Sequence, residues 1–457
     1  MPLLSLLDYL KIGNFIVSII NLGVRQMKLF GTMKAQDNQL VIGGVSAKDL
    51  VREYGSPLYV FDEELIREYC RDYRKHFKCE ENNNRVAFAG KAFLTLQMCK
   101  LLKEEKMNLD VVSGGELYTA YKAGFPLEKV MFHGNNKTLD EIQLGVKLGV
   151  GNFVVDNCYE MEVLNNIAKE YNKVQDIYLR ITPGIEAHTH EYIKTGQIDS
   201  KFGFAPVDTV IEDAIKMAVS LENINLAGIH CHIGSQIFDL EPYADAVEIM
   251  LELVRNTKEN LGYSIKEVDF GGGFGVYYTK DDEPKTTEEY CGTIINKVDE
   301  VCARTGQERP ILTIEPGRSI VANAGLTLYT VGSIKEIPGI RKYVSVDGGM
   351  TDNIRPALYN AEYECILANK VSDVSEEIVT ISGKCCESGD ILLEHVKLPQ
   401  VESGDVLAIM TTGAYGYSMS SNYNKIPKPA VVMVKDNEAR LICKRESYED
   451  LLKNDIE

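Results

Sequence analysis

The sequence predicts an α/β chain, a (β/α)8 TIM barrel followed by a C-terminal all-β domain. Between residues 85 and 316, eight short apolar runs alternate with stretches of helical periodicity. After about residue 325 helical periodicity becomes scarce, and short alternating segments are separated by Gly, Asp and Pro. Eight β/α units close a barrel, and 457 residues are too many for one compact domain.

The eight apolar runs are the expected barrel strands. They are nearly continuous in apolar character, as in parallel strands that are buried on both faces. Helical stretches lie between them, so that successive runs form β/α units. The runs are 86–89, 109–112, 130–132, 153–155, 177–181, 226–230, 268–270 and 311–314, and the helices include 92–106, 138–148, 159–171, 207–220, 241–261 and 286–305.

The whole chain divides into four predicted segments. The N-terminal apolar stretches are interrupted by polar residues, are too short to span a bilayer and lack the features of a signal peptide. Met27 and Met33 lie just before the first convincing domain sequence. The segments are 1–32, a dispensable extension; 33–61, which joins the β domain; 62–324, the barrel; and 325–457, the C-terminal β domain.

Charge and cysteine usage limit the partners of the chain. The formal net charge of −18 argues against nucleic acid and against anionic membrane surfaces. The eleven cysteines are scattered and form neither a zinc framework nor a disulfide scaffold. We therefore expect reduced thiols and a cytoplasmic protein.

Polar residues gather where the predicted strands end. In barrels of this kind the catalytic groups come from the C-terminal ends of the strands. Convergence of reactive side chains on one rim is hard to explain by packing alone. The strand-end residues are Lys91, Asp110, Ser113, Glu116, His133, Asn135, Asn136, Asp156, Asn157, Arg180, His230, His232, Ser235, Gly271, Gly272, Gly273, Glu315 and Arg318.

Lys91 is the most informative of these residues because it ends a buried strand. A desolvated lysine has a lowered pKa and can form an imine with an aldehyde. The alternative is a strand-end lysine whose ammonium reaches solvent. The other strand ends favour the reactive lysine.

Three further strand ends allow more than one function. Gly271–Gly273 could admit a phosphate to the backbone N–H groups, or could simply form a tight turn. His230 and His232 lie on one face of their strand, a spacing that suits either a metal ion or an imidazole stacked on a flat cofactor, and His188 and His190 repeat it. Glu315 could act as a base, bind a metal or pair with a pyridinium nitrogen.

Three motifs stand in the second domain. They are the segment from Asp347 to Tyr359, the segment from Cys385 to Asp390, and the run from Gly413 to Asn424. Gly, Asp and Ser are common in turns, so turn formation is the alternative for each motif. A thiol beside a carboxylate could serve as a catalytic acid.

Taken together and in order, the motifs resemble the fold-type III pyridoxal-phosphate decarboxylases, and within them the diaminopimelate decarboxylase group. The resemblance extends from about Ile42 to about Arg445. It rests most specifically on Phe88–Phe93, His230–Gln236, Glu315–Arg318, Cys386–Ser388 and Gly413–Asn424. It implies an alanine racemase-like barrel and pyridoxal 5'-phosphate as the cofactor, with no metal.

The resemblance also implies a role for each matching residue. Lys91 would bind the cofactor covalently, His230 would stack on its ring, and Glu315 would pair with the ring nitrogen. The phosphate would be held by Ser235, Gly273, Tyr415 and the Glu315-Pro316-Gly317-Arg318 segment. Arg318, Arg355, Tyr359, Glu387 and Tyr415 would contact the substrate, and Cys386 would donate the proton that replaces carbon dioxide. Cys385 is a second thiol beside it, and the spacing to Glu387-Ser388 favours Cys386 as the donor.

The implied substrate is meso-diaminopimelate, which carries an ammonium and a carboxylate at each end. Arginines suit its distal carboxylate, and Glu387 suits its distal ammonium. An ornithine- or arginine-type decarboxylase of the same fold is the nearest alternative, although Cys386-Glu387 replaces the Cys-Asp of the ornithine type. A non-catalytic pyridoxal-phosphate-binding protein and a metal-dependent hydrolase are the others. The resemblance further implies a homodimer with shared active sites.

Overall fold

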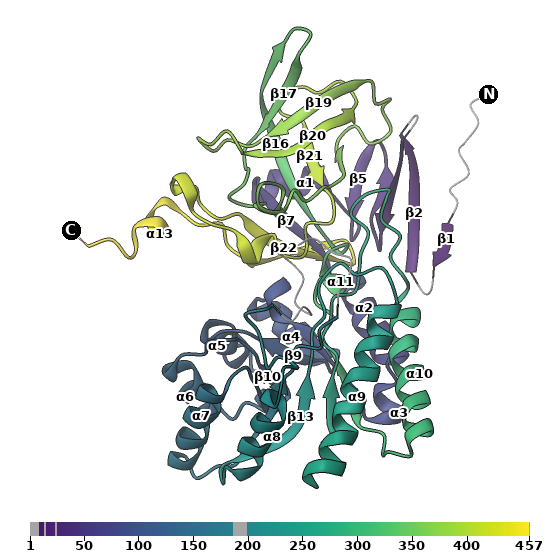
Figure 1. Cartoon of the computed structure of the whole chain (residues 1–457). Helices are drawn as coiled ribbons and strands as arrows, with labels where there is room; N and C mark the ends of the chain where they lie inside the picture. Colours follow the sequence, from purple (N-terminus) through teal and green to yellow (C-terminus); the bar gives the residue numbers. More distant parts are fainter. Residues whose placement is uncertain (1–8, 13–14, 23–24, 186–198, 457) are drawn as a thin grey trace. The chain divides into compact units, whose positions relative to one another are not determined.

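The computed structural model describes residues 9–12, 15–22, 25–185 and 199–456 (Figure 1). His188 and His190 lie outside the described residues. The chain forms two compact units. Unit 1 comprises the chain up to Tyr69 together with Val276–Glu283 and Ile320–Glu457, and unit 2 comprises Cys70–Gly275 and Pro284–Ser319.

Unit 2 contains a closed barrel of eight parallel strands, in the order in which they occur along the chain. The predicted fold class is therefore confirmed, and every predicted strand overlaps an observed one. The strands are β8 (Arg85–Ala89), β9 (Asn108–Val111), β10 (Val130–Phe132), β11 (Asn152–Val155), β12 (Gln175–Arg180), β13 (Ile224–His230), β14 (Glu267–Asp269) and β15 (Ile311–Ile314).

Helices surround the barrel strands, as Figure 1 shows for α5 to α10. Capping boxes begin two of them, at Thr138 with Glu141 and at Thr286 with Glu289. The helices are α2 (Glu63–His76), which begins in unit 1, α3 (Cys79–Asn82), α4 (Leu96–Glu104), α5 (Gly114–Lys122), α6 (Leu139–Leu148), α7 (Cys158–Glu170), α8 (Val210–Ser220), α9 (Glu241–Leu261), α10 (Thr287–Thr305) and α11 (Arg318–Val321), which ends in unit 1.

The helix after the first strand begins later than its sequence pattern indicates. Periodicity from residue 92 predicts a helix there, but α4 begins at Leu96. The side chain of Thr95 accepts the N–H of Met98 and so fixes the first turn. Gly90–Ala92 form a separate 3-10 turn that carries Lys91.

Unit 1 is built on one large sheet in which β7 lies between β16 and β22. Part of the predicted N-terminal segment thus forms a strand of the C-terminal sheet. The strands of this sheet are β7 (Leu58–Asp62), β16 (Gly325–Ile337), β17 (Arg341–Val346), β18 (Cys365–Leu367), β19 (Glu377–Ser382), β20 (Ile391–Leu398), β21 (Val406–Ile409), β22 (Ala430–Lys435) and β23 (Glu438–Cys443).

Smaller elements complete unit 1. Two three-stranded sheets lie at its N-terminal end, and three short helices accompany the sheets. The elements are β1 (Tyr9–Ile12), β2 (Phe15–Leu22), β3 (Arg25–Phe30), β4 (Lys34–Gln36), β5 (Gln39–Ile42), β6 (Val45–Ser46), α1 (Ala47–Tyr54), α12 (Arg355–Tyr359) and α13 (Tyr448–Leu452). None of the described helices is both long and apolar enough to cross a bilayer.

The end of the N-terminal extension packs into unit 1. Met27 and Leu29 are fully buried in its hydrophobic core. Thr32 donates from its hydroxyl and from its backbone N–H to Asp62, at 2.6 and 2.8 Å. The dispensability of residues 1–32 stays a prediction. Because of these contacts, we expect only the part of the extension before Met27 to be dispensable.

Candidate active site

The centre of the barrel rim is a carboxylate held between two histidines. Glu315 follows β15, His133 follows β10, and His230 is the last residue of β13. Nε2 of His133 lies 2.7 Å from one oxygen of Glu315, and Nε2 of His230 lies 3.2 Å from the other. All three side chains are buried. The barrel closure therefore brings together residues that are far apart in the sequence.

The charges of this group follow from burial and contact. Burial opposes ionisation of Glu315, but the two histidines hold its pKa well below the usual value. Burial lowers the pKa of His230 to about 4, so its imidazole is neutral near pH 7. Because ionised Glu315 can only accept, Nε2 of His230 donates to it, and Nδ1 of His230 is buried without a partner among the described residues.

Lys91 does not have the environment that the sequence predicts. Its side chain is exposed, because the 3-10 turn places it on the rim and outside the strand. The expected desolvation is therefore wrong for this structure, and the amine is accessible to an aldehyde from solvent. Lys91 remains close enough to the buried acids that its charge lowers the pKa of Asp110 and of Glu116, while burial, the larger effect, raises both.

Glycines allow the loop after β14 to approach the loops after β13 and β15 closely. Gly273 has φ of +97°, and a Cβ there would stand 2.4 Å from the carbonyl oxygen of Gly234. A Cβ on Gly272 would stand 2.2 Å from the carbonyl oxygen of Glu315. The hydroxyl of Ser235, next to Gly234, accepts from Nη2 of Arg318 at 3.0 Å. The glycines thus let the loops pack together, and they bring the Ser235 hydroxyl and the Arg318 guanidinium to one place, where both groups suit a phosphate.

The segment Glu315-Pro316-Gly317-Arg318 also packs against the strand that precedes Lys91. The N–H of Ala89 donates to the carbonyl oxygen of Pro316 at 3.3 Å. A Cβ on Gly317 would lie 2.8 Å from Cβ of Ala89. Only glycine at this position lets the end of β15 lie against the end of β8.

The histidine pair considered for a metal ion is separated in the structure. His232 accepts from the N–H of Gly272 at 3.3 Å, whereas His230 faces Glu315. The potential ligand atoms of His133, His230 and Glu315 lie within 4.8 Å of one another. Among the described residues, these three could together bind a metal ion. The same geometry suits a flat cofactor whose ring nitrogen pairs with Glu315.

Unit 1 carries the other predicted site residues. Arg355 and Tyr359 are the first and last residues of α12, and Tyr415 follows β21 with φ of +59°. Arg355 is buried and donates from Nη1 to the hydroxyls of Tyr278 and Tyr363. Tyr278 belongs to Val276–Glu283, which packs in unit 1.

The Cys385–Asp390 turn joins β19 to β20, and backbone hydrogen bonds to Asp390 hold it in place. Buried Asp390 accepts from the N–H of Met350 at 2.6 Å and from the N–H of Cys385 at 2.8 Å. Cys386 is exposed, and its N–H donates to Asn424 at 2.8 Å. Glu387 is exposed as well. The structure thus ties together the three unit 1 motifs that the sequence singles out.

The two adjacent thiols differ in environment. Burial, and to a lesser extent Asp390, raises the pKa of Cys385 to about 11. Cys386 is exposed where Cys385 is half-buried. Exposure favours Cys386 as the thiol that can reach a substrate.

Several polar residues of the site receive no role from the sequence. His133 and Asp110 appear there only as strand-end residues, and Asp390 only as part of a motif. Tyr278 and Tyr363 do not stand out at all, because tyrosine is frequent in this chain and the two are far apart in sequence. The sequence offers one signal of function for these residues, a position at the end of a predicted strand. Only His133 and Asp110 have it.

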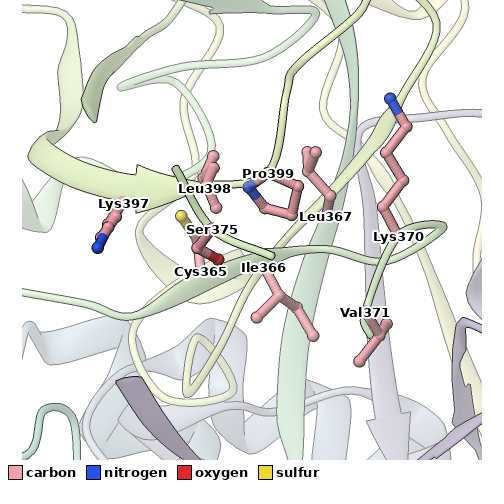
Figure 2. A pocket seen from close by; sticks show the side chains of 9 residues that line it. All are labelled: Cys365, Ile366, Leu367, Lys370, Val371, Ser375, Lys397, Leu398 and Pro399. Atoms are coloured by element: carbon pink, nitrogen blue, oxygen red, sulfur yellow. The ribbon is translucent and has the colours of Figure 1, made fainter. Parts of the chain in front are cut away.

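A small pocket in unit 1 is not part of this site (Figure 2). It has a volume of about 10 Å³, which is room for about one water molecule. The pocket is too small for a substrate or cofactor. Its lining residues are Cys365, Ile366, Leu367, Lys370, Val371, Ser375, Lys397, Leu398 and Pro399.

Comparison with known proteins decides between the alternatives. Residues 63–322 match the model for the pyridoxal binding domain of pyridoxal-dependent decarboxylases. The chain is 51% identical over 431 residues to diaminopimelate decarboxylase from Bacillus subtilis, covering 94% of this chain and 98% of the relative. It is 45% identical to the enzyme of the same name from Staphylococcus aureus, over 92% of this chain and 98% of the relative.

The chain belongs to the diaminopimelate decarboxylase family.

Solved structures of this family agree with the fold. Diaminopimelate decarboxylase from M. jannaschii aligns with a TM-score of 0.87 and 39% identity, over 93% of this chain and 98% of that one. The Helicobacter pylori enzyme complexed with L-lysine aligns with a TM-score of 0.80 and 32% identity, over 89% of this chain and 98% of that one. A lysine/ornithine decarboxylase from Vibrio vulnificus, at 21% identity and a TM-score of 0.71, shares the fold.

Family membership confirms the predicted enzyme class and cofactor. The chain is a pyridoxal-phosphate-dependent decarboxylase. The residues of unit 2 fit the cofactor, since they provide an accessible lysine, an ionised carboxylate beside an imidazole, and glycine loops beside a hydroxyl. The cluster of His133, His230 and Glu315 also has the geometry that such a cofactor needs beside its ring nitrogen.

Proposed function

We propose that this chain decarboxylates meso-2,6-diaminopimelate to L-lysine and carbon dioxide, the last step of lysine biosynthesis by the diaminopimelate pathway. The observation that carries this proposal is the match to diaminopimelate decarboxylases across both units, at 51% identity over 94% of the chain. The solved relatives named as complexes with L-lysine support the product.

Lys91, His230 and Glu315 hold the cofactor in this proposal. Pyridoxal phosphate, when bound, acts as an electron sink: it accepts the electron pair of the bond that breaks when the carboxylate leaves as carbon dioxide. Lys91 would bind it covalently, His230 would stack on its ring, and ionised Glu315 would keep the ring nitrogen protonated. The phosphate is held by Ser235, Gly273, Gly317 and Tyr415. Support comes from the exposed amine of Lys91 and from the low pKa of Glu315, which its histidine neighbours cause against the effect of burial.

Recognition of the substrate depends on opposite charges at its distal end. Arg318 and Arg355 bind the distal carboxylate, Glu387 accepts from the distal ammonium, and Tyr359 and Tyr415 line the site. A substrate that lacks either distal group leaves a charged side chain without a partner, which costs binding free energy. This arrangement favours diaminopimelate over ornithine, arginine and lysine.

Cys386 donates the proton that takes the place of carbon dioxide on the substrate carbon. Its exposure and the hydrogen bond from its N–H to Asn424 support this role. The neighbouring Cys385 is a poorer donor near neutral pH, because burial and Asp390 raise its pKa to about 11.

We further propose that the enzyme is a cytoplasmic homodimer with shared active sites. All eleven cysteines are free, as in a reducing compartment. The exposed position of Cys386 and Glu387 suits residues that complete the active site of a partner subunit.

A carbon dioxide release assay tests the proposal. The purified chain with pyridoxal phosphate is given meso-diaminopimelate, ornithine, arginine or lysine in separate reactions. Release from diaminopimelate alone is expected, and the Lys91→Ala variant should release none and lose the absorbance near 420 nm that borohydride abolishes, a rough value for this chromophore. Release from ornithine or arginine instead would favour the basic amino-acid decarboxylases.

A further inference from the structure

Arg355 is held by two tyrosines and by no acid of the described chain. Its guanidinium carbon lies 5.1 Å from the ring centroid of Tyr278 and 5.6 Å from that of Tyr363. The two rings meet edge to face, with centroids 5.3 Å apart and an interplanar angle of 87°. The three residues are 6 to 8% exposed. We call Tyr278, Arg355 and Tyr363 the tyrosine cage.

The hydrogen bonds of the cage use one nitrogen of the guanidinium. Nη1 donates to the hydroxyl of Tyr278 at 3.1 Å and also to the hydroxyl of Tyr363. A guanidinium has five N–H donors, and Nη1 carries two of them. The edge formed by Nε and Nη2 carries the other three, and this edge matches a carboxylate in a bidentate pair. The cage therefore fixes the plane of the guanidinium and leaves its carboxylate-binding edge for another group.

The charge of Arg355 is not neutralised within the cage. Neutral phenols and ring faces stabilise the cation, but they cannot cancel its charge. Two acids flank Tyr363 in the sequence. Glu362 is exposed, and Glu364 accepts from the hydroxyl of Tyr277 at 3.2 Å. A buried guanidinium without a paired acid attracts an anion strongly, because burial weakens the screening by water.

We infer that Tyr278 and Tyr363 are positioning residues that set the specificity for a substrate with a distal carboxylate by orienting Arg355. The inference rests on the proposed function, in which Arg355 binds that carboxylate. Tyrosine serves this purpose better than an acid would, since an acid would itself occupy the guanidinium and compete with the substrate.

Removing one hydroxyl at a time tests the inference. Tyr278→Phe and Tyr363→Phe keep the rings and remove a single hydrogen bond to the cation. Each should raise KM for meso-diaminopimelate about tenfold and leave kcat within about twofold, because the bond serves binding and not the chemical step. Tyr54→Phe is the control, since its hydroxyl donates to the carbonyl of Ala439 elsewhere in unit 1 at 3.2 Å.

Direct binding separates positioning from a structural role. L-lysine keeps one carboxylate, and cadaverine is the same molecule without it. Calorimetric titration of the holoenzyme variants should show a loss of about tenfold in affinity for L-lysine and no change for cadaverine. A lowered melting temperature together with unchanged KM and L-lysine affinity would show that the tyrosines only support the fold, and would overturn the inference.

The two proposals fail in different ways. A wild-type chain that does not decarboxylate meso-diaminopimelate overturns the proposed function. The L-lysine titration then still tests whether the two tyrosines orient Arg355. If the wild-type chain is active and both phenylalanine variants keep its KM, only the positioning role of the two tyrosines is overturned.

Discussion

At the scale of single residues, the site depends on which carboxylates are ionised. Glu315 is an anion because two histidines outweigh its burial. Asp110, Glu116 and Asp269 lie in the same unit, and burial raises the pKa of each. One rim thus holds both an ionised acid that can pair with a protonated ring nitrogen and acids that resist ionisation. The sequence shows where these residues stand, but only their distances decide their charges.

Glu116 gives a pH-dependent prediction. Its pKa is about 4.3 in an unfolded chain, and burial raises it to about 7 in the fold. The stability that its proton provides is complete below about pH 4.3 and is lost as the pH rises through about 7. Glu116→Gln cannot ionise, so the free energy of unfolding of the variant relative to wild type should grow by about 3 kcal/mol between pH 4 and pH 8.

Denaturant unfolding at several pH values measures this difference. A constant difference for Glu116→Gln would contradict the raised pKa.

At the scale of elements, the sequence predicts the barrel strands, but it does not predict the caps and side-chain contacts that hold the site residues in place. Runs such as 86–89 and 311–314 identify barrel strands because both faces are buried. The start of α4 was missed because the Thr95 cap decides it, whereas apolar periodicity continues through the turn. The tyrosine cage was missed because its members come from separate segments of unit 1. Site residues at strand ends can be expected from topology, whereas residues that hold them in place depend on tertiary packing.

The turn between β19 and β20 gives a prediction about Asp390. Its carboxylate accepts two backbone N–H groups, those of Met350 and Cys385. Asp390→Ala leaves both without their acceptor, which costs about 2 to 4 kcal/mol of stability. Because the turn carries Cys386, kcat should fall more than tenfold while KM changes little.

Thermal melting and steady-state kinetics measure the two effects. Glu438→Ala removes an exposed acid from β23 of the same sheet and should leave both values near wild type. Wild-type kcat in a destabilised Asp390→Ala protein would show that the turn does not position the thiol.

At the scale of the whole molecule, the chain combines two units with different tasks. The barrel of unit 2 contains Lys91, His230 and Glu315, the residues that we propose bind the cofactor. Unit 1 supplies Arg355, Cys386 and Glu387. In the proposed function, the residues for cofactor chemistry thus lie in one unit. Most of the residues for substrate choice and proton delivery lie in the other.

The N-terminal extension gives a prediction from two truncations. A chain that begins at Met27 keeps the buried Met27 and Leu29 and the bonds of Thr32, and should match the melting temperature of the full chain. A chain that begins at Met33 loses two fully buried side chains, which costs several kcal/mol. Equal melting temperatures for both truncations would show that the whole segment 1–32 is dispensable. Intact-mass measurement on the native protein identifies the true start.

Shared active sites predict complementation between inactive subunits. Lys91→Ala and Cys386→Ala should each be inactive alone. Mixing them under conditions of subunit exchange should restore part of the activity, because some mixed dimers contain one site with both residues intact. Activity that stays at the level of the separate variants would indicate that each subunit builds its own site.

The central claim is that this pyridoxal-phosphate enzyme chooses its substrate by a second pair of charged groups. The most direct test is a competition, in which the holoenzyme receives an equimolar mixture of meso-diaminopimelate, ornithine, arginine and lysine, and the products are followed by mass spectrometry. We predict that diaminopimelate disappears while lysine accumulates in equal amount and the other amino acids persist. Formation of putrescine, agmatine or cadaverine while diaminopimelate remains would contradict it.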